Sequence, residues 1–343
     1  MQTIISLPQP IQRAITALLA DAGSNAWMKR AQLLHERYRQ QETNKQQLHV
    51  VDALDTLAYL GLRASATYSQ IWGAVDALCA IVPSWQPTTL LDLGCGAGSG
   101  LWALTELLPS LTQATAVDQN AHFLTLGQQI LNAAQEPLTV VWQQANLLQS
   151  VQQGAATYDV VLLANVLNEL NEQQRATVVE AAFKRCNGIL LIVEPGTPVG
   201  SGIVQTAAQQ LAPVGTLLAP YLGNQFVSEA WLHFPQRFTR PDFARRLRQS
   251  MRESDLMASD WEEAKYSYVV VGKLIPEITP WARVIGPTQL TKGSITVPLL
   301  TAEGRLLARV LKRHKQAFLL AKKLRWGETV QQRADLFNQV DPY

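Results

Sequence analysis

The chain has 343 residues, of which 47% are hydrophobic and 16% are charged. This length and apolar content favour one sizeable core with appended parts, or two domains, and they exclude wholesale disorder. The net charge of +2 leaves nucleic-acid binding to local basic patches, and three scattered cysteines without metal-ligand spacing argue against a disulfide framework and a zinc site.

The sequence gives no indication of a membrane segment. No apolar run reaches the roughly 18–20 residues that a membrane span needs. The first residues lack a basic start followed by an apolar block and a cleavage site, so no secretory signal is predicted. We therefore expect no membrane partner and a cytoplasmic location.

The first 84 residues are predicted to form a helical region. Apolar residues recur at three- and four-residue steps over 11–19, 27–35 and 52–81, as they do on one face of an amphipathic helix. Pro83 then ends this pattern.

A second region, predicted for residues 85–275, alternates short apolar runs with helix-length segments. Because burial on both sides makes such runs continuously apolar, we predict an α/β fold with a mostly parallel, seven-stranded sheet and helices on both faces. The last two strands, separated by a long insertion that contains a helix, are expected to pair antiparallel at a sheet edge. The candidate strands are 88–94, 114–118, 138–143, 158–165, 188–196, 216–220 and 266–273.

The last region, residues 276–343, is predicted to be a small β-rich extension with many basic residues. Residues 305–325 contain eight Lys or Arg and no acidic residue, and residues 237–252 contain six arginines and one aspartate. Such tracts can contact RNA phosphates in a salt-dependent way. The alternative is the solvated face of an amphipathic helix, because Leu307 and Val310 lie between the charges of the first tract.

A glycine-rich segment, LLDLGCGAGSGLWAL at residues 90–104, joins a predicted strand to a predicted helix. Glycine permits positive φ and a close approach of the backbone to a ligand, and the helix start offers free N–H groups. The next strand ends at Asp118, 24 residues after Gly94, where a carboxylate can accept hydrogen bonds from both ribose hydroxyls. The glycines of the segment are Gly94, Gly96, Gly98 and Gly100.

The spacing of the segment distinguishes between cofactors. A dinucleotide site would prefer GxGxxG, whereas this segment has the pattern DxGCGxGxG, with Asp92 before the first glycine. S-adenosylmethionine (SAM) has no phosphate, and its ammonium group needs acceptors such as Asp92. We therefore predict a class I SAM-methyltransferase fold, with a tight turn without ligand and a nicotinamide site as alternatives. The predicted cofactor residues in this part are Asp92, Gly94, Gly96, Gly98 and Asp118.

Two asparagines extend the predicted cofactor site. Asn146 follows the third strand, where a polar side chain often meets the adenine amino group; a surface-loop asparagine is the alternative. Asn165 ends the fourth strand at the carboxyl edge, where open α/β sheets bind ligands. Asn168 and Glu169 follow on the first turn of a helix and could equally cap it.

One family carries several strings of this chain in the same order. The chain resembles the methyltransferase-like proteins of the mitochondrial ribosomal small subunit and their bacterial relatives, from about residue 60 to about residue 328. The VEPGTPVG and WLHFPQRF strings are more specific than the glycine turn. The strings are RASATYSQ at 63–70, VLLANVLNEL at 161–170, LLIVEPGTPVGSGIV at 190–204, WLHFPQRF at 231–238 and KYSYVVVGK at 265–273.

This resemblance implies a SAM-type fold that associates with the small ribosomal subunit, and with its rRNA, during assembly. Many relatives carry four cysteines that hold an iron–sulfur cluster near the sixth strand. Here Tyr221 and Leu232 occupy places where such ligands are expected, and residues 216–234 contain no cysteine. Because thiolates hold such clusters, we expect no iron–sulfur cluster and no metal. Packing around Trp231, Phe234 and Tyr221 should hold this loop, and a mobile loop is the alternative.

The catalytic residues are less clearly indicated. SAM is itself a strong electrophile, so the protein mainly aligns the nucleophile and excludes water. A general base, where one is needed, would come from Glu169, Glu194 or His233; Glu194 is expected to hydrogen-bond a loop N–H rather than to orient a substrate. The sequence has no (N/D)PPY string, and Cys186 lies in a short turn before a strand, which argues against a cysteine nucleophile.

Three functions remain open at this point. The first is a SAM-binding methyltransferase-like protein of the small ribosomal subunit that methylates rRNA. The second is a non-catalytic ribosome assembly factor that keeps the fold. The third is a small-molecule SAM methyltransferase, which would have a deep apolar pocket and no accessible basic surface beside the cofactor site.

Overall fold

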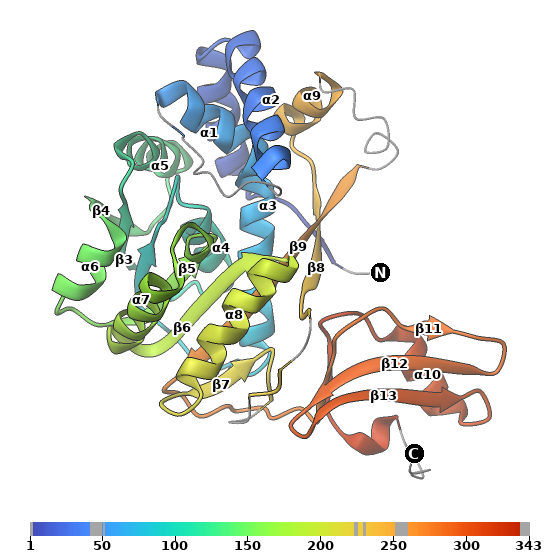
Figure 1. Cartoon of the computed structure of the whole chain (residues 1–343). Helices are drawn as coiled ribbons and strands as arrows, with labels where there is room; N and C mark the ends of the chain where they lie inside the picture. The colour runs from blue at the N-terminus through green and yellow to red at the C-terminus, as the bar shows by residue number, and fades with distance from the viewer. Residues whose placement is uncertain are drawn as a thin grey trace.

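The computed structural model describes residues 3–41, 50, 52–222, 226–228, 231–250 and 260–336. Two sheets and the helices around them make up this part of the chain (Figure 1). The helices are α1 (Gln9–Asp21), α2 (Ser24–Gln41), α3 (Ala53–Cys79), α4 (Ser99–Leu107), α5 (Ala121–Ala134), α6 (Leu147–Gln153), α7 (Glu172–Lys184), α8 (Pro198–Leu211), α9 (Asp242–Ser250) and α10 (Lys315–Lys323), with 3-10 turns η1 (Leu167–Glu169) and η3 (Arg333–Asp335). The strands are β1 (Ile4–Ile5), β2 (Thr89–Leu93), β3 (Gln113–Asp118), β4 (Thr139–Gln144), β5 (Tyr158–Ala164), β6 (Cys186–Pro195), β7 (Thr216–Ala219), β8 (Phe234–Thr239), β9 (Trp261–Gly272), β10 (Ala282–Val284), β11 (Gln289–Leu290), β12 (Ser294–Thr301), β13 (Gly304–Leu311) and β14 (Thr329–Val330). Within these residues no helix has both the length and the apolar character needed to cross a membrane.

The seven predicted strands are all present, as β2 to β7 and β9. Strands β4, β3, β2, β5 and β6 lie side by side in this order and run parallel. β9 pairs antiparallel with β6 and with β7, so the antiparallel pair expected at the end of the sheet is confirmed. Helices α7 and α8 lie on one face of the sheet, and α3 and α4 lie on the other (Figure 1). The predicted α/β, Rossmann-like class I SAM-methyltransferase fold is confirmed.

The central sheet is wider than predicted. β9 starts at Trp261 rather than at residue 266, its first half pairs with β8, and β1 runs parallel to β8, which gives nine strands. The segment of β8, FPQRFT, did not indicate a strand because it contains a proline and three polar residues. Cys186 also differs from expectation, because it is the first residue of β6 and not part of the preceding turn.

The N-terminal region is helical as predicted, and it shares one continuous apolar core with the central sheet. Asp52 caps α3 by accepting a hydrogen bond from the N–H of Asp55 at 2.8 Å. Arg30 on α2 forms ion pairs with Asp52 at 3.0 Å and with the buried Asp55 at 2.9 Å. These contacts fix the start of α3, which then runs for 27 residues against α4 and β9.

The C-terminal residues form a second, five-stranded sheet with a small apolar core of its own. Its order is β11, β12, β10 and β14, and β13 pairs along the whole length of β12. Residues 304–311 are therefore a strand, so the amphipathic-helix interpretation of Leu307 and Val310 is wrong. Alternation along β13 buries Val310 and leaves Leu307 exposed. The division of the chain at residues 84 and 275 stays a proposal.

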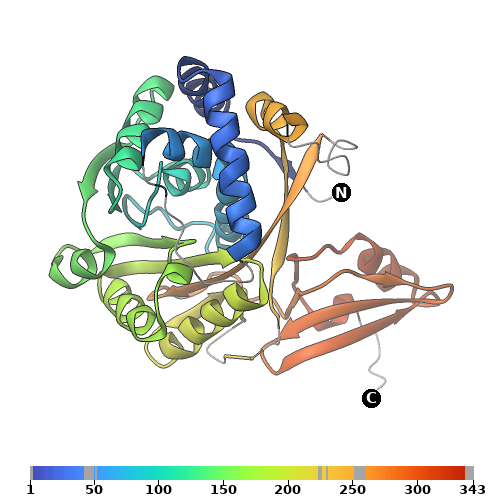
Figure 2. The same cartoon turned by 45° about the horizontal axis from the view of Figure 1, so that its top comes forward.

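Arg283 on β10 joins the C-terminal sheet to the central body. Its side chain is buried, and it donates from Nε to the carbonyl of Pro220 at 3.1 Å and from Nη1 to the carbonyl of Gly327 at 2.8 Å. Figures 1 and 2 both show the C-terminal sheet beside the end of the central sheet that carries β7 and β8. The second sheet is thus attached by hydrogen bonds to backbone atoms of both parts.

Candidate functional site

The glycine-rich segment folds as a tight connection between β2 and α4. Gly94, Gly96 and Gly98 have positive φ angles of 79°, 53° and 95°, a region that other residues rarely adopt. Space is also restricted, because a Cβ on Gly94 would lie 2.7 Å from Cγ2 of Val166. The turn therefore needs glycine, and it presents the first N–H groups of α4 at the carboxyl edge of the sheet.

Asp118 ends β3 beside this turn. Its Oδ2 accepts a hydrogen bond from the N–H of Gly96 at 2.9 Å, and its Oδ1 accepts one from the N–H of Asn120 at 2.8 Å. Burial raises the pKa of Asp118, and the N–H donors partly oppose this by stabilising the anion. Because each carboxylate oxygen has two lone pairs, Asp118 both holds the turn and keeps capacity to accept hydrogen bonds from a ligand.

Asp92 lies on β2, beneath the turn. The residue is 2% exposed, and its Oδ2 has no hydrogen-bond partner among the described atoms. A Cβ on Gly100 would lie 2.6 Å from that oxygen, so Oδ2 faces the first turn of α4. Burial, together with the negative charge of Asp118, raises the pKa of Asp92 to about 8. The carboxyl group is thus mostly protonated at neutral pH, and a cation nearby would favour its ionised form.

Asn165 follows β5 at the same edge, in a left-handed conformation with φ of 54° that asparagine tolerates better than most residues. Its Nδ2 donates to Oε1 of Gln70 at 3.1 Å, and Nε2 of Gln70 donates to the carbonyl of Lys265 at 2.9 Å. The Oδ1 of Asn165 is buried and has no partner among the described atoms. Gln70 therefore orients Asn165 so that its acceptor oxygen is left for another group.

Glu194, near the end of β6, is fully buried. Its Oε1 accepts a hydrogen bond from the N–H of Leu167 at 2.8 Å, and its Oε2 accepts one from Nδ2 of Asn168 at 2.8 Å. Burial raises the pKa of Glu194 to about 7 although these donors oppose the shift. Glu194 holds the η1 turn through these bonds, so the hydrogen bond to a loop N–H that the sequence led us to expect is present.

Glu169 ends η1, and its side chain is exposed. The pKa of Glu169 is raised because protein atoms around it displace water and because the Asp118 carboxylate is near. Neither Asn168 nor Glu169 caps the next helix, since Asn171 caps α7 by accepting from the N–H of Gln174 at 2.9 Å. Among the three candidate bases, Glu169 is the exposed one whose charge interacts with Asp118.

Asn146 is the residue before α6. Its Oδ1 accepts a hydrogen bond from the N–H of Leu148 at 3.0 Å, so it caps this helix. The expected contact of Asn146 with adenine stays a prediction.

His233 belongs to an aromatic cluster at the junction with the C-terminal sheet. Its ring stacks on Trp231 with centroids 4.3 Å apart and meets Trp326 edge-on at 4.7 Å. Burial lowers the pKa of His233, and Tyr221 is buried against Phe226 in the same loop region. These side chains do not fit an iron–sulfur cluster, and the described residues include no group of three His, Cys, Asp or Glu placed to hold a metal. That the protein binds no cluster stays a prediction, which iron analysis of the purified protein would decide.

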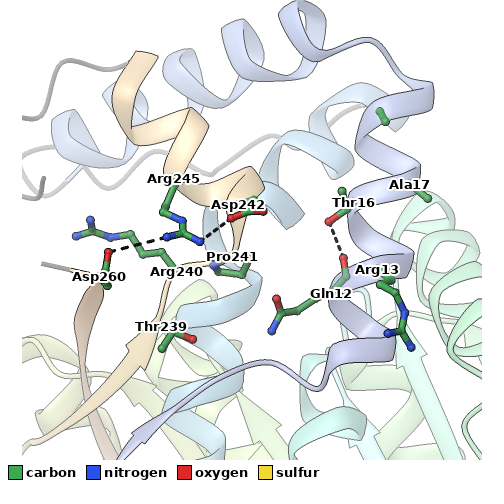
Figure 3. A pocket seen from close by; sticks show the side chains of 11 residues that line it. Gln12, Arg13, Thr16, Ala17, Thr239, Arg240, Pro241, Asp242, Arg245 and Asp260 are labelled. Atoms are coloured by element: carbon green, nitrogen blue, oxygen red, sulfur yellow. Dashed lines mark hydrogen bonds and ion pairs between the residues drawn. The ribbon is translucent and has the colours of Figure 1, made fainter.

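A groove of about 790 Å³ lies elsewhere, between α1 and the junction of β8 with α9 (Figure 3). Arg13 lines it from α1, and Arg245 lines it from α9, where it forms ion pairs with Asp242 at 2.6 Å and with Asp260 at 3.9 Å. The described residues that line it include none of the predicted cofactor residues. Because charges of both signs are mixed along its walls, its chemistry does not select a ligand of one charge.

The match to a known family covers most of this architecture. A family model described as mitochondrial small ribosomal subunit Rsm22 matches residues 53–331, which run from the start of α3 through β14. The chain belongs to this Rsm22 family. The resemblance expected from the sequence strings is thus confirmed.

A curated relative of this Rsm22-family chain is the human protein named ribosome assembly protein METTL17, mitochondrial. The two are 26% identical over 302 residues, which cover 82% of the chain and 64% of the relative. The chain therefore spans less than two thirds of the length of this relative.

Several solved structures resemble the Rsm22-family chain weakly. One is the magnesium protoporphyrin IX methyltransferase ChlM from Synechocystis PCC 6803 with bound SAM, at 10% identity and a TM-score of 0.38, covering 66% of this chain and 86% of that chain. Another is the plantazolicin methyltransferase BpumL in complex with SAH, at 12% identity and a TM-score of 0.39, covering 77% of this chain and 99% of that chain. Values this low carry no inference about substrate or reaction.

Two positioning residues of the Rsm22-family chain were not predicted. Gln70 lies in the RASATYSQ string, but a glutamine on a long helix gave no sign that it would reach Asn165. Val166, which precedes η1, packs on Gly94, and local sequence patterns do not indicate a contact between residues so far apart in the chain.

Proposed function

We propose that this chain binds SAM at the carboxyl edge of the central sheet and works with the small ribosomal subunit by contacting its RNA. The observation that carries the cofactor part is a pair of buried acceptor atoms without hydrogen-bond partners in the described residues, Oδ2 of Asp92 and Oδ1 of Asn165. A buried acceptor left without a partner costs about 1–3 kcal/mol. SAM carries an ammonium and a sulfonium group, so it supplies the donor and the positive charge that such acceptors favour.

Other groups at this edge suit the remaining parts of SAM. Asp118 has lone-pair capacity for the ribose hydroxyls, next to the N–H groups at the start of α4. Asn146 stands after β4, on the side where adenine is expected. When bound, SAM supplies an electrophilic methyl group. Asp92, Asp118, Asn146 and Asn165, with the turn glycines Gly94, Gly96 and Gly98, are the residues that would hold it.

The chain's own residues would position the group that accepts the methyl, and they would activate it only weakly. Glu194 fixes η1 by a hydrogen bond, and Gln70 fixes Asn165 in the same way. Both bonds keep this edge of the site in one geometry. Glu169 is exposed, and its raised pKa brings its ionisation closer to neutral pH. For methyl transfer to an rRNA group that loses a proton, Glu169 is therefore our candidate base.

Contact with RNA is supported by family membership and by the surface of the C-terminal sheet. The exposed basic residues there include Arg305, Arg309, Lys312, Arg313, Lys315, Lys322 and Lys323. The arginine tract 237–252 offers less positive charge to RNA phosphates. Four of its arginines form ion pairs with acidic residues: Arg237, Arg240, Arg245 and Arg248. We therefore assign phosphate contact to the C-terminal sheet and α10.

A second candidate is an assembly factor that keeps the SAM fold without transferring methyl groups. The human relative is named a ribosome assembly protein, and the chain lacks the (N/D)PPY string of amino-group methyltransferases. In this case SAM binding would stabilise one conformation of the site, and Glu169 would have no catalytic part.

Two measurements separate these candidates. Calorimetry of the purified chain with SAM tests the cofactor site, and absence of measurable binding would contradict the proposal. Incubation of methyl-labelled SAM with small-subunit particles and with naked rRNA then tests transfer. Label in the rRNA that is lost in a Glu169→Gln variant supports the enzyme; SAM binding without any label supports the assembly factor.

A further inference from the structure

Trp231 is exposed close to the candidate cofactor site, although it is held rigidly. The residue is 46% exposed, its Nε1 donates to the carbonyl of Gly196 at 3.1 Å, and one face of its ring stacks on His233 with an interplanar angle of 24°. Since His233 covers one face, the exposed surface lies on the opposite face and the ring edge. Exposed tryptophan is unusual because it leaves a large apolar area in water.

A chain of hydrogen bonds connects this ring to Asn165. Gly196, which accepts from Trp231, donates its own N–H to the carbonyl of Lys265 at 3.0 Å. The same carbonyl accepts from Nε2 of Gln70 at 2.9 Å, and Gln70 accepts from Asn165. Trp231 therefore lies at the ends of β5 and β6, on the carboxyl edge where the acceptor of a methyl group would approach.

Lys265 lies beside Gly196, the residue that accepts the Trp231 hydrogen bond. The backbone and Cβ of Lys265 lie within 2.7 Å of the position that a Cβ on Gly196 would take, and the side chain of Lys265 is exposed. The charge of Lys265 is also felt by the His233 ring, since it helps to lower the pKa of His233. A flat aromatic face beside an ammonium group suits a ligand that joins a planar ring to a phosphate.

We propose that the open face of Trp231 is a platform on which an unpaired base of single-stranded RNA stacks, with Lys265 beside it for the adjoining phosphate. The inference rests on the proposed function and specifies how its RNA is held near the cofactor. Stacking between a base and an aromatic side chain tolerates any base, because every base has a π-face. Trp231 thus holds the RNA strand at this edge without itself selecting a sequence.

The test compares binding of fluorescein-labelled single-stranded oligoadenylate of about ten nucleotides by anisotropy. Trp231→Ala should weaken binding about 5-fold or more, whereas Trp231→Phe, which keeps an aromatic face, should stay within about 2-fold of the wild type. Trp261→Ala is the matched control, because it also removes an indole, in this case from the first residue of β9, where Arg237 lies over the ring at 4.2 Å. It should bind like the wild type.

An abasic oligomer of the same length separates stacking from charge. On this probe the wild type and Trp231→Ala should bind equally, because no base remains to stack. The inference is overturned if Trp231→Ala binds oligoadenylate like the wild type, if the loss persists on the abasic oligomer, or if the wild type binds neither.

Crosslinking of the wild type avoids any folding defect of a variant. Irradiation with RNA that contains 4-thiouridine should label a peptide that contains Trp231; labelling confined to residues 305–325 would contradict the platform. SAM binding, measured separately on the wild type, decides the proposed function. A chain that binds SAM but shows no effect at Trp231 therefore contradicts this inference alone.

Discussion

The buried carboxylate of Glu194 accepts a hydrogen bond from the N–H of Leu167 at 2.8 Å, and this bond ties the end of β6 to the η1 turn after β5. The turn in turn places Val166 against Gly94, where there is no room for a Cβ. One buried acid thus supports the loop that covers the glycine turn, although it does not reach the surface.

Replacing Glu194 by glutamine should change how stability depends on pH. The pKa of Glu194 is about 7 in the folded chain and near 4.5 in the unfolded chain, so wild-type stability falls as pH rises between these values. Glutamine does not titrate. The unfolding free energy of the wild type minus that of Glu194→Gln should therefore fall, by up to about 3 kcal/mol, over this window and stay level above it. Urea unfolding of both proteins across the window measures this, and a difference that rises with pH would contradict it.

An alanine at position 94 should destabilise the fold and weaken SAM binding. Gly94 has φ of 79°, and a Cβ there would lie 2.7 Å from Val166, so Gly94→Ala should cost about 1–3 kcal/mol. Gly202 is the control, since it lies in α8 with nothing within 4 Å of the added Cβ. Gly202→Ala should be neutral or stabilising by about 0.5–1 kcal/mol. Equal urea midpoints for the two variants would show that the turn does not need glycine.

The sequence was sufficient for seven of the nine strands of the central sheet and insufficient for the contacts between its loops. Continuous apolar runs such as 158–165 indicate buried strands whatever lies beside them, so the seven predicted strands are all present. β8 was missed because its strand character depends on pairing with the polar half of β9. The place of Asp118 in the site could likewise be predicted from its sequence spacing after the glycine turn. The hydrogen bond between Asn165 and Gln70 could not, because it joins residues 95 positions apart.

SAM binding should release a proton at neutral pH. The pKa of Asp92 is about 8 without ligand, so its carboxyl group is mostly protonated at pH 7, and the positive charge of SAM should lower that pKa. The binding enthalpy at pH 7 should therefore depend on the ionisation enthalpy of the buffer, and affinity should rise with pH up to about 8. Asp92→Asn should remove both effects. A wild-type enthalpy that is the same in all buffers would contradict this coupling.

Phosphate contacts by α10 should appear in the salt dependence of RNA binding. Lys322 and Lys323 are exposed in the last turn of this helix. Replacing each by alanine should reduce the slope of log K against log salt concentration by about 1 per lysine that contacts a phosphate. Lys184→Ala is the control, because Lys184 is exposed but paired with Glu180 at 2.7 Å. If Lys322→Ala and Lys323→Ala both keep the wild-type slope, as the Lys184→Ala control should, the RNA phosphates do not contact α10.

The most direct test of the cofactor site is calorimetry with SAM on the wild type, on Asp118→Ala and on Asp159→Ala. Asp159 is a matched control, because it also accepts hydrogen bonds from backbone N–H groups, those of Thr88 and Thr89 at 2.8 and 3.0 Å, but at the amino end of its strand. We predict binding by the wild type and by Asp159→Ala, and a loss of about tenfold or more in affinity for Asp118→Ala. No binding by the wild type, or equal binding by Asp118→Ala, would contradict the proposed site.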